Sequence, residues 1–277
     1  MQISKGVLYM MLAALSFAFV GLGVKLLKHI SNLEVNFFKA IICMLICYTV
    51  AQHKQISLWG HNRQLLWARG ITGALAIILF FVTLEHMPLA MATILQNTCP
   101  IFTAILGIFM LQQVVTRKQW FCFALAMLGV IVANGVSVMV TPGYVLLGLI
   151  SAFSMGITNN LNTLLKDKEG PVVIIFYMSL FTALGTLGFL FQDFTPLYIP
   201  DLLILLGIGL CTFLADVLAI RAFQLASVAQ VSAVSYLGIP YSLVLGFIFL
   251  GEVYTWVHLL GMGCVVSGSL LSIDRNR

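Results

Sequence analysis

Long apolar runs separated by short linkers make up almost the whole chain, and this pattern restricts the fold more than any other feature. Of the 277 residues, 61% are hydrophobic and only 8% are charged, whereas a soluble domain carries about 25% charged residues. An α-helix needs ~20 apolar residues to cross the hydrocarbon core of a bilayer. The sequence therefore predicts an all-α integral membrane protein with ten transmembrane helices. The predicted spans cover residues 4–27, 33–51, 65–84, 87–111, 118–138, 143–165, 171–191, 200–221, 226–249 and 255–273.

Basic residues are concentrated in alternate linkers. With a cytoplasmic N-terminus, the cytoplasmic segments hold ten basic residues and the outer segments hold only Lys28. Positive charge favours the cytoplasmic side, so we expect both termini to be cytoplasmic, in a bacterial-type inner membrane. The net charge of +5 then reflects orientation and does not indicate a nucleic-acid partner. The ten residues are Lys5, Lys54, Arg63, Arg117, Lys118, Lys166, Lys168, Arg221, Arg275 and Arg277.

The two halves of the chain resemble each other at a nearly constant spacing. Gly107 matches Gly246 at an offset of 139, and Ser16 matches Ser154 at an offset of 138. A repeat of five spans is odd, so the second half should cross the membrane in the opposite sense to the first. Many secondary transporters are built from inverted repeats of this kind. The expected five-helix repeats are residues 1–140 and 141–277.

The fourth and ninth predicted spans carry polar residues inside apolar stretches. Gln96 and Asn97 precede Pro100, and Tyr236 precedes Pro240. Polar clusters and prolines are tolerated within a bilayer where they face protein or water. Interrupted helices in corresponding positions of two halves point to a transporter's binding site. We therefore expect both prolines to bend their helices beside one water-filled cavity. Its expected lining includes Gln96, Asn97, Asn159 and Tyr236.

Several motifs are spread over both halves of the chain, namely Leu33–Phe38 with Lys39, Ala68-Arg69-Gly70, Pro100, Gly129, Pro240, Phe249-Leu250-Gly251-Glu252 and Gly268. In these motifs, and along essentially its whole length, the chain resembles the EamA-type carriers of the drug/metabolite transporter superfamily. The resemblance implies a ten-helix carrier with a central cavity lined by helices 1, 3, 4, 6, 8 and 9. The stretches that end at Lys39 and Gly70 look most like the subgroup that includes S-adenosylmethionine carriers. One departure is Gln112-Gln113, which stands where a Gly-Glu pair is common.

Charged residues within the predicted spans are few, and Asp216 is the most informative. A carboxylate at this depth costs ~2.5–3.5 kcal/mol unless it is paired, hydrated or protonated. It could contact a cationic group of the substrate or a coupling proton, or it could form an ion pair with Arg69 or Arg221. Lys39 also needs a partner at its depth, and the candidate partners are Glu34 and Glu85. Lys25 is expected to anchor its helix at the membrane interface.

Polar and aromatic side chains of other spans complete the candidate site. The amides of span six could bind a polar ligand or could hold helices together, and the same two alternatives apply to aromatic residues near Pro240. Arg69 could face the transport pathway or extend to the lipid headgroups. The candidate substrate-binding residues are Ser16, Arg69, Gln96, Asn97, Asn159, Asp216, Ser235 and Tyr236, with Pro100 and Pro240 as helix-bend residues.

The function that follows is secondary transport of a small organic metabolite by alternating access. Motifs of nucleotide-driven pumps, metalloproteases and serine hydrolases are absent from the sequence. We therefore expect no enzymatic activity, no cofactor and no bound metal. A cationic or zwitterionic substrate is favoured, such as an amino acid or S-adenosylmethionine. Alternatives are an exporter of broad specificity and, less favoured, a membrane-embedded enzyme or a channel. The expected partners are the substrate, the lipid bilayer and a coupling proton, and the chain is expected to act as a monomer.

Overall fold

The computed structural model describes residues 4–134, 141–190 and 195–272, and the regular elements in this part of the chain are all α-helices. Arg275, Arg277 and the predicted span ends at 138, 191 and 273 lie outside it. The helices are α1 (Lys5–Leu26), α2 (Asn32–Lys54), α3 (Arg63–His86), α4 (Leu89–Gln96), α5 (Cys99–Leu111), α6 (Arg117–Asn134), α7 (Pro142–Leu164), α8 (Pro171–Leu190), α9 (Ile199–Leu225), α10 (Val228–Ser235), α11 (Gly238–Leu250) and α12 (Trp256–Leu271).

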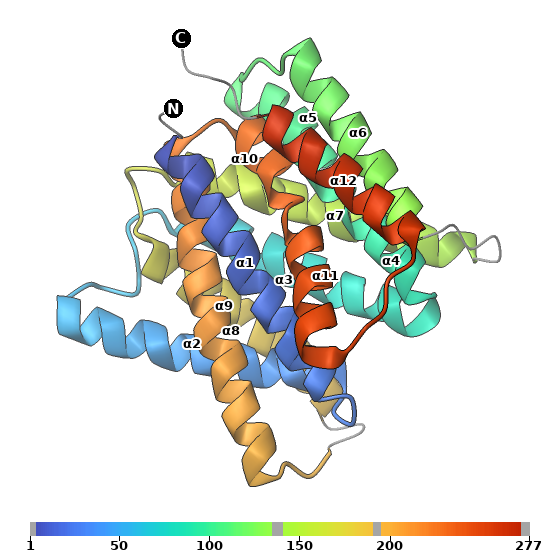
Figure 1. Cartoon of the computed structure of the whole chain (residues 1–277). Coiled ribbons are helices and arrows are strands. Elements are labelled where there is room, and N and C mark those ends of the chain that lie inside the picture. Colours follow the sequence, from blue (N-terminus) through green and yellow to red (C-terminus); the bar gives the residue numbers. More distant parts are fainter. Residues whose placement is uncertain (1–3, 135–140, 191–194, 273–277) are drawn as a thin grey trace.

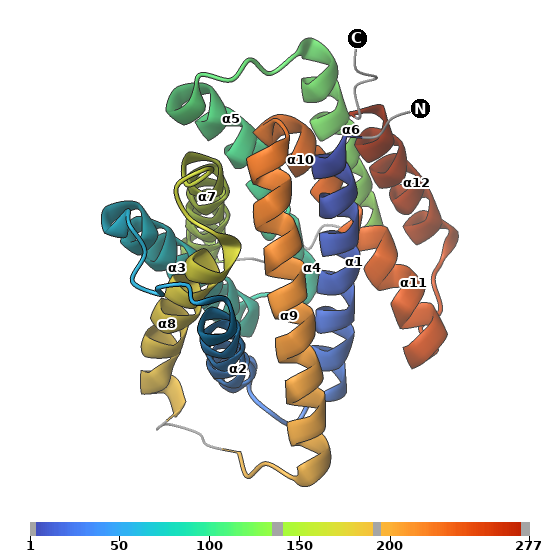
Figure 2. The ribbon, with the colours of Figure 1, turned by 90° about the vertical axis from the view of Figure 1, so that its left-hand side faces the viewer.

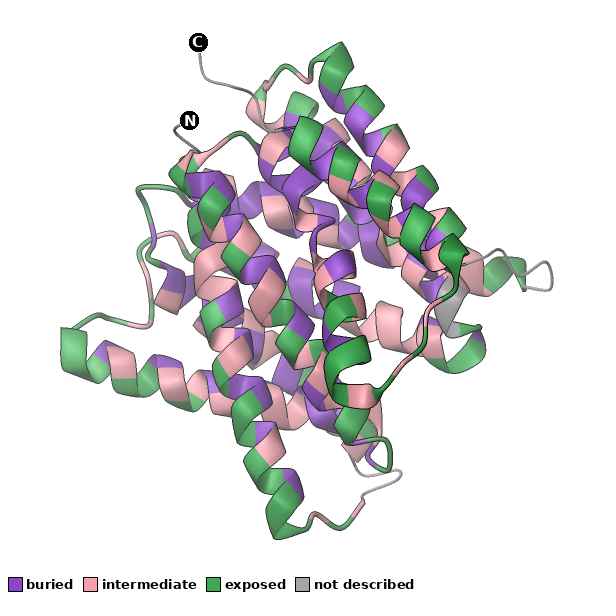
Figure 3. Cartoon of the chain, in the orientation of Figure 1, coloured by how far each residue is buried: buried purple, intermediate pink, exposed green. Residues whose placement is uncertain are grey.

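Eight helical segments in the described chain are long and apolar enough to cross a membrane. Two of these segments, Met91–Leu111 and Val228–Leu250, each combine a pair of consecutive helices. Many large apolar side chains lie on the outside, and the outer faces of the helices are largely exposed in Figure 3. Examples are Phe109, Leu203 and Leu260, which are 77%, 65% and 68% exposed. Such an extensive apolar surface is expected of a protein that is surrounded by lipid.

Helix ends follow the local sequence signals. Before α2, the Ser31 side chain accepts a hydrogen bond from the backbone of Leu33, and Glu34 accepts one from the backbone of Ser31. This reciprocal capping satisfies backbone donors that the first helical turn leaves free. Pro142 and Pro171 begin α7 and α8, where proline costs no intrahelical hydrogen bond.

The two proline-containing spans are broken helices. Helix α4 ends at Gln96 and α5 begins at Cys99, while α10 ends at Ser235 and α11 begins at Gly238. Both prolines lie in the first turn of the second piece, and the residues of each break keep right-handed helical backbone angles, so each interruption lies just before its proline. At these positions their missing N–H removes no intrahelical hydrogen bond. The breaks lie against each other, because the Tyr236 hydroxyl donates to the Asn97 carbonyl oxygen at 2.8 Å.

Helices α5 and α11 end in the same way. Gln112 and Gly251 follow them with left-handed backbone conformations, at φ values of 52° and 65°. The next backbone N–H, of Gln113 or Glu252, donates at 3.2 Å to the carbonyl oxygen of the glycine six residues earlier. A left-handed residue is uncommon without glycine, so Gln112 occupies a position that Gly251 fills without steric cost.

Helices α6 and α12 pack so closely that glycines form their contact (Figure 1). A Cβ atom built on Gly129 would lie 2.5 Å from the carbonyl oxygen of Gly261. A Cβ atom on Gly268 would lie 2.8 Å from the carbonyl oxygen of Cys122. Figure 2 shows this pair at one side of the molecule, with α3 and α8 at the opposite side and α1 and α9 between them.

The end of α1 is tied to the loop that follows α11. Lys25 Nζ lies 2.8 Å from Glu252 Oε1, and the Tyr254 hydroxyl donates to Glu252 Oε2 at 2.6 Å. The hydrogen bond from Lys25 has the largest effect on Glu252 and the one from Tyr254 the next largest, and both hold the pKa of Glu252 below its usual value. The bridge is partly exposed, with side chains 46% and 34% accessible, so its contribution to stability is at most about 1 kcal/mol. Lys25 therefore has a protein partner in addition to its interface position.

Candidate functional site

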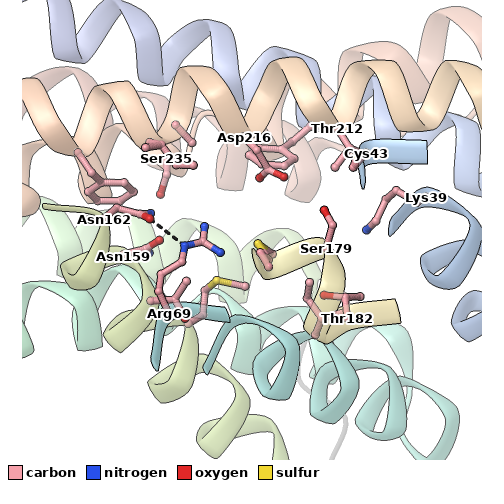
Figure 4. Close-up of a pocket in the computed structure, with 18 of the residues that line it drawn as sticks. Lys39, Cys43, Arg69, Asn159, Asn162, Ser179, Thr182, Thr212, Asp216 and Ser235 are labelled. Atoms are coloured by element: carbon pink, nitrogen blue, oxygen red, sulfur yellow. Dashed lines mark hydrogen bonds between the residues drawn. The ribbon is translucent and has the colours of Figure 1, made fainter. Parts of the chain in front are cut away.

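A cavity of about 360 Å³ lies in the middle of the helix bundle. Helices α1, α2, α3, α7, α8 and α9 line it, together with residues beside the break between α10 and α11. Figure 4 shows that its polar side chains project from several helices toward one space. A volume in this range is typical of small-molecule sites. The labelled polar residues are Lys39, Cys43, Arg69, Asn159, Asn162, Ser179, Thr182, Thr212, Asp216 and Ser235.

The set of lining helices differs from the one that the resemblance implied. Helices α2 and α8, the second and seventh spans, contribute Lys39 and Ser179. Helices α4 and α5, the fourth span, contribute none of the residues described along the cavity. The side chains of α5 instead pack against α7, where Asn159 Nδ2 donates to Thr103 Oγ1 at 3.2 Å.

Arg69 is held at one end of the cavity by Asn162. The arginine is 3% exposed, and its Nε donates to Asn162 Oδ1 at 2.9 Å. Gly73, one turn later on α3, leaves space beside the guanidinium, because a Cβ there would lie 3.3 Å from Nη1. Nη1 is buried and has no hydrogen-bond partner in the described structure. Arg69 is thus a cation in the cavity wall, and its Nη1 is enclosed beside Gly73 without a hydrogen-bond acceptor among the described residues.

Asp216 faces the cavity without a partner. Among the described residues, no lysine, arginine or histidine nitrogen lies within 4.0 Å of its carboxylate, and its side chain makes no hydrogen bond there. The ion pairs considered from the sequence, with Arg69 or Arg221, are therefore not formed. Arg221 lies on an exposed face of α9. Asp216 nevertheless lies close enough to Arg69 and Lys39 to interact with both electrostatically.

Lys39 lies at the other end of the cavity, and its expected partners lie elsewhere. Its Nζ donates to Asn36 Oδ1 at 2.5 Å, one turn earlier on α2. Glu34 accepts hydrogen bonds from the backbone N–H groups of Ser31 and Thr195 instead, the latter at 2.8 Å. Glu85 is exposed at the end of α3. The capping of α2 thus takes up the carboxylate that Lys39 was expected to use.

Half of the candidate site residues lie on the cavity, namely Arg69, Asn159, Asp216 and Ser235. The other four lie outside it because they hold helices together or satisfy backbone groups. Ser16 donates to the Leu12 carbonyl, Gln96 accepts from Ser151, Asn97 donates to the Thr93 carbonyl, and Tyr236, which is 1% exposed, donates to Asn97. Of the four residues expected to share one water-filled space, only Asn159 lines it.

Several lining residues were not selected from the sequence, although helical spacing would have indicated them. Residues three or four positions apart share one face of a helix. Such pairs line the cavity in α2, α7, α8 and α9, and each pair contains at least one polar or charged residue. The pairs are Lys39 and Cys43, Asn159 and Asn162, Ser179 and Thr182, and Thr212 and Asp216.

The arrangement is suited to binding rather than to bond making. The cavity combines two cations, one carboxylate, amides and hydroxyls with apolar walls that include Met10, Met155 and Met178. In the described chain, no group of three His, Cys, Asp or Glu side chains is placed to hold a metal ion. Few precisely placed polar groups within an apolar cavity fix the orientation of a small ligand.

Named transporters are among the relatives of this chain. It is 26% identical to the pseudopaline exporter CntI of Pseudomonas aeruginosa, over 99% of this chain and 98% of the exporter. It is 25% identical to an uncharacterized transporter of Helicobacter pylori, over 96% and 93% of the two chains. It is 23% identical to solute carrier family 35 member G1 of Mus musculus, over 94% of this chain and 76% of the relative. These relatives give no support for the narrower resemblance to S-adenosylmethionine carriers.

The fold also has a close counterpart among solved structures. One crystal structure superposes with a TM-score of 0.87 and covers 98% of this chain and 97% of its own, at 15% sequence identity. The model of the EamA-like transporter family matches residues 4–135 and again residues 142–273. The two matches together include nearly the whole chain, and the relatives are transporters rather than enzymes. The chain therefore belongs to the EamA-like transporter family.

Proposed function

We propose that this protein is a secondary transporter that moves a small organic metabolite across a bacterial inner membrane by alternating access. The central cavity is its substrate site. Asp216 carries the argument, because an unpaired carboxylate deep in a membrane-spanning bundle is expensive unless a ligand, water or a proton compensates it. In a carrier whose two halves rock against each other, the substrate itself is such a ligand and reaches the site once in each cycle.

Two inverted five-helix repeats and ten membrane spans are part of the proposal. The double match of the family model supports the repeats. The contact between the helix breaks gives further support, because Tyr236 and Asn97 are 139 residues apart and thus occupy equivalent positions. Helices α6 and α12 supply the fifth and tenth spans beside the eight long apolar segments.

One end of the bundle is more tightly closed than the other, as a carrier in one of its two states requires. Gln113 Oε1 accepts a hydrogen bond from the backbone of Val228 at 2.9 Å, and α5 packs along α10. The equivalent residue, Glu252, binds Lys25 instead, and the described parts of α4 and α11 do not pack comparably. Figure 2 shows α5, α10 and the start of α1 at the same end. The positive-inside rule assigns this end to the cytoplasm, so the cavity faces outward.

Transport should be measured with purified protein in liposomes. A carrier that alternates between two states shows saturable uptake and counterflow, in which unlabelled substrate inside the vesicle accelerates entry of labelled substrate. Loading the vesicles with extracts fractionated by charge would supply candidate substrates, and protein-free liposomes are the control. Uptake that rises linearly with concentration and shows no counterflow would indicate a channel and contradict the proposal.

The proposed topology predicts a labelling pattern for single cysteine substitutions in exposed loops. The native cysteines are buried or half-buried, so background labelling by a membrane-impermeant thiol reagent should be low. Lys28→Cys should be labelled in intact cells, because the loop after α1 is placed outside. Ser57→Cys should be labelled only after the membrane is permeabilised. Labelling of Ser57→Cys in intact cells would reverse the assignment of the two faces.

A further inference from the structure

We infer that the cavity binds a substrate with one amino group and at least two carboxylate groups, the amino group on Asp216 and the carboxylates on Arg69 and Lys39. The inference rests on the proposed transport function, and it names the chemical class of substrate that the same cavity takes. It revises the cationic or simple zwitterionic substrate that the sequence favoured.

The first support is the charge of the cavity lining. Three charged residues lie among the described lining residues, and they are two cations, Lys39 and Arg69, with one anion, Asp216. A substrate with a single positive charge would satisfy Asp216 and leave both cations uncompensated. A dicarboxylate without an amine would satisfy the cations and bring negative charge toward Asp216. Only a ligand with the opposite set of charges, two negative and one positive, compensates all three residues.

The second support is that the three charged side chains form no ion pair with one another in the described structure. No oxygen of Asp216 lies within 4.0 Å of a nitrogen of Lys39 or Arg69 in the described structure. Two ion pairs between described residues, Lys25 with Glu252 and His29 with Asp201, lie outside the cavity. Charges that remain apart in a largely apolar space are available to a ligand placed between them.

The third support is the order of the groups along the cavity. In Figure 4, Arg69 lies with Asn162 and Asn159 toward one end, Lys39 lies near Ser179 toward the other, and Asp216 lies between them. The Arg69 Nη1 group is buried without a partner, while Asn162 fixes Nε and thus the plane of the guanidinium. This order places the amino group of the ligand between its two carboxylates.

The remaining walls restrict the size and polarity of the ligand. A volume of about 360 Å³ is near the lower end of the usual range for small-molecule sites. Met10, Met155 and Met178 line the cavity, and their flexible thioether side chains adapt to varied apolar shapes. The ligand is therefore a compact amino dicarboxylate that can carry one apolar or aromatic substituent.

Binding to the purified protein tests this inference separately from transport. The probes are three amino dicarboxylates, namely aspartate, glutamate and iminodiacetate. The comparison compounds are glutamine, which lacks the second carboxylate, glutarate, which lacks the amine, and ornithine, which replaces a carboxylate by an amine. A ligand that binds the folded state raises the melting temperature by mass action, and titration calorimetry gives the affinity. We expect at least one amino dicarboxylate to bind about tenfold or more tightly than the comparison compounds, since each lost charged hydrogen bond costs about that factor.

Variants of the charged residues should change the selectivity in a matched way. Lys39→Met should remove the preference for glutamate over glutamine and keep the preference over glutarate. Asp216→Asn should do the reverse. Lys54→Met, the same substitution at an exposed position of α2, should change neither preference. A residue with a purely structural role would lower the stability without shifting these ratios.

The possible outcomes separate the two proposals. Amino dicarboxylate binding without counterflow in liposomes would contradict the transport function and leave the substrate class standing. Counterflow of an amine or a diamine, with no preference for amino dicarboxylates, would overturn the substrate class and leave the transporter standing. If all three amino dicarboxylates fail to bind at millimolar concentration, or if both charge variants keep the selectivity of the unmodified protein, the substrate class is overturned.

Discussion

Replacement of Asp216 by asparagine should abolish concentrative transport while the protein remains folded and inserted. Asparagine keeps the size and part of the hydrogen bonding of aspartate, but it cannot carry a charge or a coupling proton. Loss of a charged hydrogen bond of about 1.5–3 kcal/mol corresponds to roughly 10- to 100-fold weaker interaction with the substrate. Uptake into proteoliposomes, compared with melting temperature in the same preparation, measures both effects.

The structure also predicts the sign of the stability change. Asp216 has no ion-pair partner within 4.0 Å in the described structure, so its neutralisation leaves no newly unpaired cation. We therefore expect the melting temperature to stay constant or to rise, because an unpaired buried charge is costly. A buried ion pair would instead lose ~3–5 kcal/mol when one partner is removed, which a second neutralising change at Arg69 would then restore.

A matched control is available at Asp167, an exposed residue in the loop after α7. Its backbone is left-handed, at a φ of 62°, and asparagine adopts this conformation readily. Asp167→Asn should leave both transport and stability unchanged. Full transport by the Asp216→Asn variant would remove Asp216 from the mechanism.

A single methyl group at Gly261 should destabilise the whole protein by separating α6 from α12. The added Cβ would lie 2.6 Å from the Gly129 carbonyl oxygen and 2.7 Å from the Ala133 nitrogen. Both are backbone atoms, so the helices must move apart rather than a side chain rotate. Overpacking of this kind costs ~1–3 kcal/mol, which exceeds the gain of about 1 kcal/mol from replacing glycine by alanine in a helix. Thermal unfolding and the yield of folded protein would report the loss.

The same substitution two residues later should have the opposite sign. Gly263 is exposed, and nothing lies within 4 Å of a Cβ built there. Gly263→Ala should therefore be neutral or slightly stabilising, because only the helix propensity changes. Equal effects at the two positions would show that the contact between α6 and α12 does not limit stability.

Most of the helices could be predicted from the sequence because hydrophobicity fixes where a chain can cross a bilayer. The predicted span 33–51 lies within α2, and span 143–165 agrees with α7 to within one residue. The positions of the two helix interruptions were also predictable, because proline lacks the N–H that would continue the helical hydrogen bonds. The contact between the two breaks, from Tyr236 to Asn97, joins segments 139 residues apart, and no local pattern reveals it.

The candidate site was harder to predict because buried polar residues in a membrane protein serve two purposes. Gln96 and Asn97 were selected for their position before Pro100. In the structure, however, Gln96 accepts a hydrogen bond from Ser151, and Asn97 donates one to the Thr93 carbonyl. Lys39 was expected to have a carboxylate partner, but Glu34 is used to cap a helix. Whether a polar side chain meets protein or empty space depends on how helices from both halves pack together, which the sequence does not state directly.

The hydrogen bond between the two helix breaks has a consequence for how such a chain can diversify. Tyr236 and Asn97 lie 139 residues apart, so under the proposed inverted repeats a dimer of identical half-length chains would bring one residue against its own copy at this point. Every substitution there would occur twice, on both sides of the axis. Joining two halves in a single gene removes this coupling. Since the acceptor is a main-chain oxygen, a change of side chain at 97 would lose only the local hydrogen bond to the Thr93 carbonyl, while the tyrosine keeps the crossing in place.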